Sequence, residues 1–145
     1  MATPWSVAES LVTTLQEELA GKILVDATNP IAPDFSGLLF GHKDSGGQVV
    51  ARLAPGAKVV KGFNTVGFNI MADPSINGEP ATLLLAGDDL QAKETVAILA
   101  KRIGFAPVDI GPISNASLVE ASAWLWISLS QKIGRDFAFI LTKRN

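Results

Sequence analysis

Helix-like patterns alternate with short apolar runs along the whole chain, and this alternation limits the fold more than any other feature of the sequence. The clearest apolar run extends from Ala81 to Ala86 and ends at Gly87. Such a run suits a strand that is covered on both faces, as in parallel sheets flanked by helices. The alternation therefore predicts an α/β fold, with a mainly parallel sheet of about five strands between two layers of helices.

Local signals place the individual elements. A capping-box pattern begins at Ser6, and the apolar periodicity that follows predicts one helix up to Gly21. The remaining expected elements are strands at 23–25, 58–63, 81–86, 105–110 and 136–142, and helices at 48–53, up to about 72, from Asp88 or Asp89 to 103, and from Ser114 or Asn115 to 133. Residues 31–47, which are rich in glycine, predict a surface loop. We expect one domain over residues 1–145.

The residue inventory excludes several kinds of chemistry. The chain has no Cys, no Tyr and one His, His42. Disulfides, thiolate catalysis, Cys/His zinc sites and a tyrosine general acid are therefore excluded. His42 lies in the glycine-rich loop, and no G-x-S-x-G elbow accompanies it, so a solvated histidine is favoured over a member of a catalytic triad.

The charge pattern bears on partners and location. The formal net charge is -2, and the basic residues form no stripe that could follow a nucleic acid backbone. The N-terminus carries no basic region, and Glu120 and several serines interrupt the most apolar stretch. These features predict a cytoplasmic protein that binds neither nucleic acid nor membrane.

Three carboxylates have both a structural and a functional interpretation. Asp88 and Asp89 could bind a cation, but their position directly before a helical stripe is typical of a helix N-cap. Glu120 lies within an apolar helix, where it must find a hydrogen-bond donor or line a ligand pocket. We favour the structural interpretation for all three residues.

Two asparagines are the strongest candidates for a ligand site. Asn29 and Asn64 each follow a predicted strand, and ligands of open α/β sheets bind beyond the carboxyl ends of the strands. An Asx-turn at each position is the alternative interpretation. Their amides do not titrate, so together they suit a reaction that needs positioning rather than proton transfer, such as hydride transfer between two cofactors.

No glycine-rich phosphate loop is present in the sequence. A dinucleotide fingerprint requires two glycines separated by exactly one residue, and none of the 13 glycines is spaced in this way. A P-loop motif is absent as well, because no two glycines with the spacing of that motif are followed by its lysine.

Four segments nevertheless resemble one known family. Residues 21–30, 58–65, 87–89 and 104–112 are similar to the deazaflavin-dependent NADP reductases, which are dinucleotide-binding oxidoreductases related to the reductase domain of the metalloreductases. The resemblance extends from Ala2 to Asn145. Members of that family usually have alanine at the position of Gly62.

The resemblance implies a partial Rossmann-like, three-layer fold. Family members begin with a glycine-rich βαβ unit, whereas this chain starts at the segment that follows it, so the sequence is expected to be N-terminally truncated. The family's cofactor is NADP, with a deazaflavin or flavin as second cofactor. The resemblance places the nicotinamide half of the cleft at Pro4, Trp5, Asn29, Pro30, Asn64 and Thr65. Without the pyrophosphate anchor, the chain is expected to bind NADP weakly or not at all.

Several interpretations of function stay open at this point. The first is an oxidoreductase of that family with an impaired cofactor site, and the second is a non-catalytic, self-associating module derived from the fold. A third is one piece of a split gene that needs a separate chain. We expect a homodimer, formed through the edge of strand 23–27 or through the Trp124, Trp126 and Ile127 side of the long helix, because an uncovered sheet edge exposes unpaired backbone groups.

Overall fold

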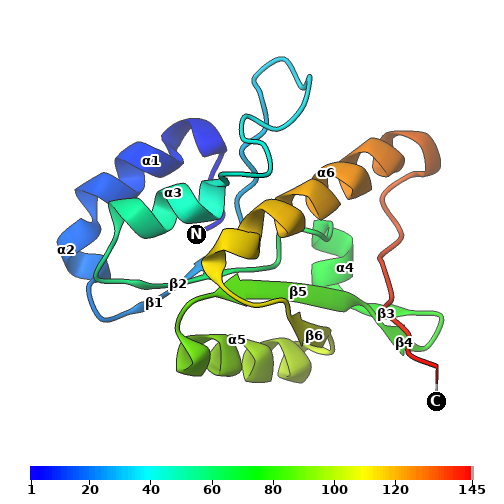
Figure 1. The fold of residues 1–145 in the computed structure, drawn as a ribbon. Helices are drawn as coiled ribbons and strands as arrows, with labels where there is room; N and C mark the ends of the chain where they lie inside the picture. The colour runs from blue at the N-terminus through cyan, green and yellow to red at the C-terminus, as the bar shows by residue number, and fades with distance from the viewer. Residues whose placement is uncertain (145) are drawn as a thin grey trace.

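A computed structural model describes residues 1–144 of the chain. Its main sheet has four strands in the order β1-β2-β5-β6 (Figure 1). The strands are β1 (Ile23–Asp26), β2 (Lys58–Lys61), β5 (Thr82–Gly87) and β6 (Ala106–Asp109). A separate two-stranded hairpin contains β3 (Ser75–Ile76) and β4 (Glu79–Pro80).

The sheet is mixed rather than uniformly parallel. β1 pairs with β2 in parallel, and β5 pairs with β6 in parallel. The central pair is antiparallel, since Val60 lies opposite Gly87 and Lys61 opposite Ala86. The predicted α/β class with a mainly parallel sheet is confirmed, and the β2–β5 pair is the antiparallel exception within it. The carboxyl ends of β1 and β2 therefore point toward one end of the sheet, and those of β5 and β6 point toward the opposite end.

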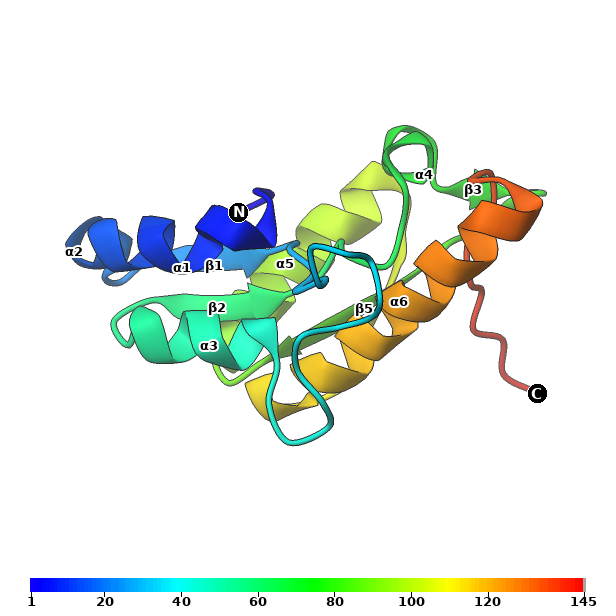
Figure 2. The same ribbon diagram turned by 90° about the horizontal axis from the view of Figure 1, so that it is seen from above.

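Helices cover both faces of the sheet, as predicted. The helices are α1 (Trp5–Thr14), α2 (Gln16–Leu19), α3 (Gly46–Leu53), α4 (Phe68–Ala72), α5 (Leu90–Ile103), the 3₁₀ turn η1 (Ile113–Asn115) and α6 (Ala116–Ile133). Figure 1 shows α1, α3 and α6 on one side of the sheet and α5 on the other. The view from above shows α1 and α3 beside the β1–β2 half and α6 running along β5 (Figure 2).

The alternation of side chains along β2 explains how the sheet separates two cores. Val59 faces the cluster built with α1 and α3, which includes Val50 and Ala54. Val60 faces the cluster built with α5. Because successive side chains of a strand point to opposite faces, Lys61 lies on the same face as Val59, beneath α3 and α6.

Helix ends agree in part with the expected signals. The Asp89 side chain accepts a hydrogen bond of 2.8 Å from the Ala92 amide, and Gly104 ends α5 with a φ of 113°. The predicted first helix differs, because it begins at Trp5, has Pro4 as its N-cap and breaks at Leu15 into α1 and α2. Proline suits the first turn of a helix, since its φ is fixed and it needs no amide partner there.

The segment 136–142 is not a strand. Its alternating apolar residues are used for packing instead. The ring of Phe137 stacks on that of Trp126 with centroids 5.3 Å apart, and the Trp126 indole donates to the Phe137 carbonyl. β5 holds the segment at Thr82, whose amide donates to the Phe139 carbonyl and whose hydroxyl accepts the Leu141 amide. Trp126 is consequently buried, so it cannot belong to the exposed dimer face that the sequence suggested.

Within the part of the chain that the structure describes, α6 is the longest helix, and it is not apolar enough to cross a bilayer; nor is any shorter helix.

Candidate functional site

The parallel pairing of β1 and β2 brings the two candidate asparagines together. Asp26 and Lys61 are register partners at the carboxyl ends of these strands, so the turns that follow them lie side by side. The side-chain amide of Asn29 donates to the main-chain carbonyl of Asn64 at 3.0 Å. The side-chain amide of Asn64 donates to Asn29 Oδ1, also at 3.0 Å. These two bonds join the turns directly, so neither asparagine amide serves an Asx-turn in the described structure.

The Asn29–Asn64 pair is incompletely satisfied. Asn64 Oδ1 is buried and accepts no hydrogen bond. Asn29 uses one N–H and one lone pair in the pair, which leaves a second N–H and a second lone pair, because a carboxamide offers two of each. A buried polar atom without a partner is uncommon in folded proteins and often marks a site that an additional group completes.

A hollow of about 560 Å³ opens beside Asn29. Three of the six predicted site residues, Pro4, Trp5 and Asn29, lie in its wall. The other wall residues come from the start of the chain and from the turn and loop after β1: Ala2, Thr3, Ser6, Ala27, Thr28, Ile31, Ala32, Pro33 and Phe35. The structure thus brings together the N-terminal segment and the β1 turn, which are distant in sequence.

The other three predicted residues lie outside that wall. The Pro30 side chain is fully buried, and Asn64 sits behind Asn29. Thr65 lines a second, mostly apolar cavity of about 270 Å³ between α6 and the C-terminal segment. The predicted residues therefore form one continuous region, but only part of it faces the hollow.

Trp5 supports the hollow from beneath. Its ring lies edge-on to the Phe40 ring with centroids 5.7 Å apart. A Cβ at Gly46 would lie 2.9 Å from the Trp5 ring, so only glycine allows the start of α3 to approach this closely. The indole is thus wedged between the loop after β1 and helix α3.

A buried charged cluster lies under the site, and sequence reasoning missed its central residue, Lys61. The Lys61 side chain is completely buried, and its Nζ lies 3.0 Å from Asp26 Oδ2 and 2.9 Å from Glu120 Oε1. The same ammonium donates to the Thr28 carbonyl. Asp26 in turn accepts from the Thr28 amide and hydroxyl at 2.9 and 2.7 Å. The cluster therefore fixes the first residues of the β1 turn.

Glu120 completes the cluster from α6. Its carboxylate accepts the Gly46 amide at 3.0 Å and the Gly47 amide at 2.9 Å, in addition to Lys61. Those two amides open α3, where the helix dipole favours a negative charge. The structural interpretation of Glu120 is thus confirmed, because each of its oxygens has a donor.

One signal in the sequence could have identified Lys61. Lys61 closes a strand whose preceding residues are apolar, and Asp26 closes the neighbouring strand in the same way. A buried lysine needs an opposite charge, so two such strands in parallel predict this pair. What the sequence could not reveal is Glu120 as the third member, since the packing of α6 across the sheet brings it there.

Gly62, at the start of the second turn, is also explained by packing. A Cβ on Gly62 would lie 2.6 Å from Leu85 Cδ2. The leucine on β5 therefore fills the space that an alanine methyl would need.

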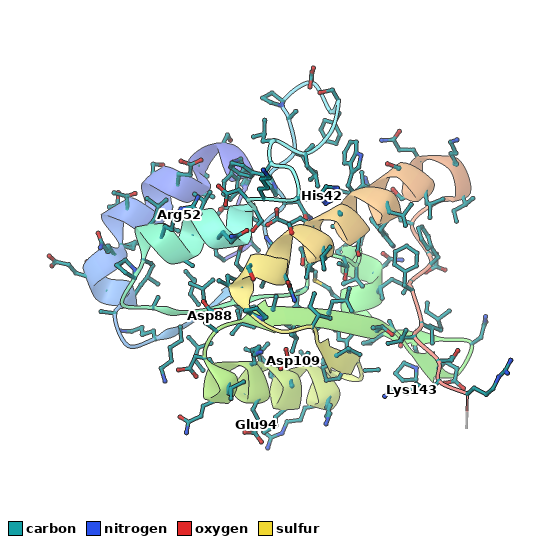
Figure 3. All side chains as sticks on the ribbon, viewed as in Figure 1. His42, Arg52, Asp88, Glu94, Asp109 and Lys143 are labelled. Carbon is teal, nitrogen blue, oxygen red and sulfur yellow. The ribbon has the colours of Figure 1, made fainter. Side chains whose placement is uncertain are left out.

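The remaining titratable candidates lie away from the hollow. Figure 3 shows His42 on the loop above α6, with Asp88 and Asp109 on the lower part of the molecule near α5. His42 is exposed. Asp88 accepts the Ile113 amide at 2.9 Å, and the Ala92 amide, followed by Lys58, holds the pKa of Asp89 below its usual value. Residues 1–144 contain no group of three or more His, Cys, Asp or Glu side chains placed to bind a metal.

Comparison with protein-family models finds no match. Among individual proteins, the chain is 37% identical to metalloreductase STEAP3 of Rattus norvegicus over 113 residues, which cover 77% of this chain and 22% of that protein. It is 31% identical to an F420-dependent NADP reductase of Methanocaldococcus jannaschii over 137 residues, covering 91% of this chain and 61% of the reductase. The chain thus spans less than two thirds of either relative.

A solved structure also resembles this chain over nearly its whole length. A candidate F420-dependent NADP reductase of Arthrobacter sp. FB24 superposes with a TM-score of 0.90 and 34% identity, covering 97% of this chain and 67% of the other. Sequence and fold agree on the relationship that segments 21–30, 58–65, 87–89 and 104–112 suggested. The chain belongs to the F420-dependent NADP reductase family.

Proposed function

We propose that this chain forms the nicotinamide half of the cofactor cleft in an oxidoreductase that transfers hydride between NADP and the deazaflavin F420. In this proposal Pro4, Trp5 and Asn29 contact the cofactor. Pro30, Asn64 and Thr65 shape the region behind them. The proposal rests on the family, because relatives carry that activity in their names.

The observation that carries the proposal is the joined pair Asn29–Asn64 beside the hollow. It lies at the carboxyl ends of two parallel strands, which is where ligands of open α/β sheets bind. The free N–H and lone pair of Asn29 complement a carboxamide, which offers both an acceptor and donors. The residues present therefore fit the nicotinamide end of the cofactor.

The chemistry of the wall also supports the proposal. Among the described residues that line the hollow, none titrates near neutral pH. The nicotinamide would supply the hydride chemistry itself when bound, and the protein would supply position and exclusion of water. Asn29 would orient the ring through its amide, and the apolar wall would shield one side.

The affinity of residues 1–145 for NADPH tests the proposal. We expect binding weaker than micromolar, because the sequence has no glycine-rich loop for the pyrophosphate. Replacing Asn29 by alanine should weaken it further, by about 2- to 10-fold, through the loss of one or two hydrogen bonds. Equilibrium dialysis with radiolabelled NADPH measures both constants.

Asn69→Ala is the matched control for that experiment. Asn69 on α4 donates to the Arg135 carbonyl and to Asp136, away from the hollow, so its loss should leave the affinity unchanged. A micromolar or tighter constant for the unaltered chain, or equal affinities for the Asn29 and Asn69 variants, would contradict the proposal.

We also infer that the chain associates with a second copy of itself through an apolar surface that contains Leu118 and Leu125 of α6 and Leu141 of the C-terminal segment. These side chains are 52%, 52% and 60% exposed, and Leu125 and Leu141 both line the apolar cavity of about 270 Å³. A two-fold interface would bury the same apolar surface twice. This property would also serve the alternative function, a non-catalytic assembly module.

Sedimentation velocity tests this association. We expect a dimer at high protein concentration, and we expect Leu125→Lys to shift it to monomer. Leu99→Lys is the control, because Leu99 is similarly exposed on α5, on the other face of the sheet. A monodisperse monomer of the unaltered chain, or an equal effect of the two substitutions, would overturn the inference.

A further inference from the structure

Among residues 1–144, three residues other than glycine adopt a left-handed backbone conformation. Phe35 has a φ of 58°, Phe63 of 65° and Asn77 of 54°. Side chains with a Cβ are disfavoured there, and bulky ones more than asparagine. Each of these residues therefore needs a compensating reason for its conformation.

Two of them have a reason that is visible in the structure. Asn77 precedes Gly78 in the turn between β3 and β4, and Asn-Gly is the residue pair that such hairpin turns prefer. The ring of Phe63 packs edge-on against that of Phe105 with centroids 5.9 Å apart, at the margin of the core. Favourable turn chemistry offsets the strain in one case, and burial offsets it in the other.

Phe35 is not buried, and the turn chemistry around it comes from its two neighbours, because Asp34 Oδ1 accepts the Ser36 amide at 3.1 Å and the Ser36 hydroxyl at 2.7 Å. The Phe35 side chain is 61% exposed, so burial does not offset the strain, and a phenylalanine is not a preferred turn residue. Both the solvent exposure of the Phe35 ring and its left-handed backbone conformation are unfavourable. Because strained residues persist where function requires them, this outlier points to a function.

The loop around Phe35 holds the residue in this conformation. The Phe35 amide donates to the Ala32 carbonyl at 2.8 Å, and the Ala32 amide donates to the Gly37 carbonyl at 2.9 Å. Ile31 and Leu38 form an antiparallel bridge at the base of the loop. Figure 1 shows this loop standing out from the body of the molecule, and Figure 2 shows it beside α3 and α6. Phe35 is therefore presented by a braced hairpin rather than by a loose segment.

The ring lies in the wall of the hollow that also contains Trp5 and Asn29. We propose that Phe35, as part of the apolar wall, packs on one face of the nicotinamide ring while Asn29 binds its carboxamide, so that the opposite face stays open to the hydride partner. This inference rests on the proposed function, and it adds a binding residue outside the six that the family resemblance implied. A flat, electron-poor ring is the ligand that an exposed phenylalanine ring recognises by stacking.

Two substitutions of Phe35 separate strain from binding. Phe35→Gly relieves the left-handed backbone and removes the ring, so the thermal midpoint should rise while ligand affinity falls. Phe35→Leu keeps the strain and an apolar side chain but removes the ring, so affinity should fall without a rise in the midpoint. For both variants we expect affinity to fall by about 2- to 10-fold, the range of one aromatic stacking contact.

The probe is oxidised nicotinamide mononucleotide, which carries the electron-poor ring, titrated into residues 1–145 and followed by the Trp5 indole N–H signal in NMR spectra. Leu39→Ala is the control, because Leu39 is half exposed in the same loop but lies outside the wall of the hollow. Weaker binding by both Phe35 variants with unchanged binding by the Leu39 variant supports the inference.

The possible failures are distinguishable. If the unaltered chain binds the mononucleotide and both Phe35 variants bind it equally well, Phe35 has no role in binding and this inference is wrong. If the unaltered chain shows no shift of the Trp5 signal at saturating concentrations, the proposed function itself is wrong at this hollow, and the inference falls with it.

Discussion

Replacing Lys61 by methionine is expected to lower the free energy of unfolding by about 3–5 kcal/mol, the typical cost of removing one partner from a buried ion pair. Methionine keeps most of the volume but leaves Asp26 and Glu120 buried without their shared cation. The Thr28 carbonyl also loses its donor. Urea unfolding followed by circular dichroism measures the change.

Lys58→Met is the matched control, because Lys58 begins the same strand. It pairs with Asp89 at 3.0 Å, but both side chains are partly exposed, and exposed ion pairs contribute little. We expect a much smaller change at Lys58. Equal losses at the two positions would show that the buried cluster has no special role in stability.

Replacing Glu120 by alanine is the second substitution with a large expected effect, again about 3–5 kcal/mol of unfolding free energy. It leaves the Gly46 and Gly47 amides without acceptors, weakens the hold on Lys61 and opens a cavity under α6. Glu120→Gln should cost less, because the amide oxygen still accepts a hydrogen bond. The same urea titration compares the two variants.

Because Lys61 and Glu120 act on each other, their effects should not add. A double variant, Lys61→Met with Glu120→Ala, is expected to lose less than the sum of the single losses, by on the order of 1 kcal/mol or more. Strict additivity would mean that the 2.9 Å contact between the two side chains carries no coupling energy.

Local signals in the sequence were sufficient wherever a short segment determines its own structure. An aspartate cap at residue 88 or 89 and a helix end at 103 were predicted because each depends on its immediate neighbours, and the structure has the cap at Asp89 and a left-handed Gly104 after the helix. The Asn77–Gly78 turn carried an equally clear hairpin signal, and the hairpin of β3 and β4 was nonetheless missed. The local sequence therefore holds enough information to predict this hairpin.

Other features depend on contacts between distant segments. The pattern at 136–142 alternates like a strand, but Phe137 stacks on Trp126 of α6 instead. The periodicity of the segment itself cannot reveal a contact with a distant residue. The reversed direction of β5 likewise leaves no mark within its own six residues, because an apolar run reads the same in both directions. At the site, the sequence placed Asn29 and Asn64 after two strands, whereas their hydrogen bonds to each other, the hollow and the position of Phe35 required the folded structure.

The antiparallel contact between β2 and β5 has a practical consequence for anyone who modifies this protein. The loops that follow β5 and β6, around Asp88 and Gly111, leave the sheet in the direction opposite to the Asn29–Asn64 turns. A fluorophore or affinity handle attached at these loops would point away from the hollow, because β5 runs opposite to β1 and β2. Surface immobilisation there would leave the ligand entrance free.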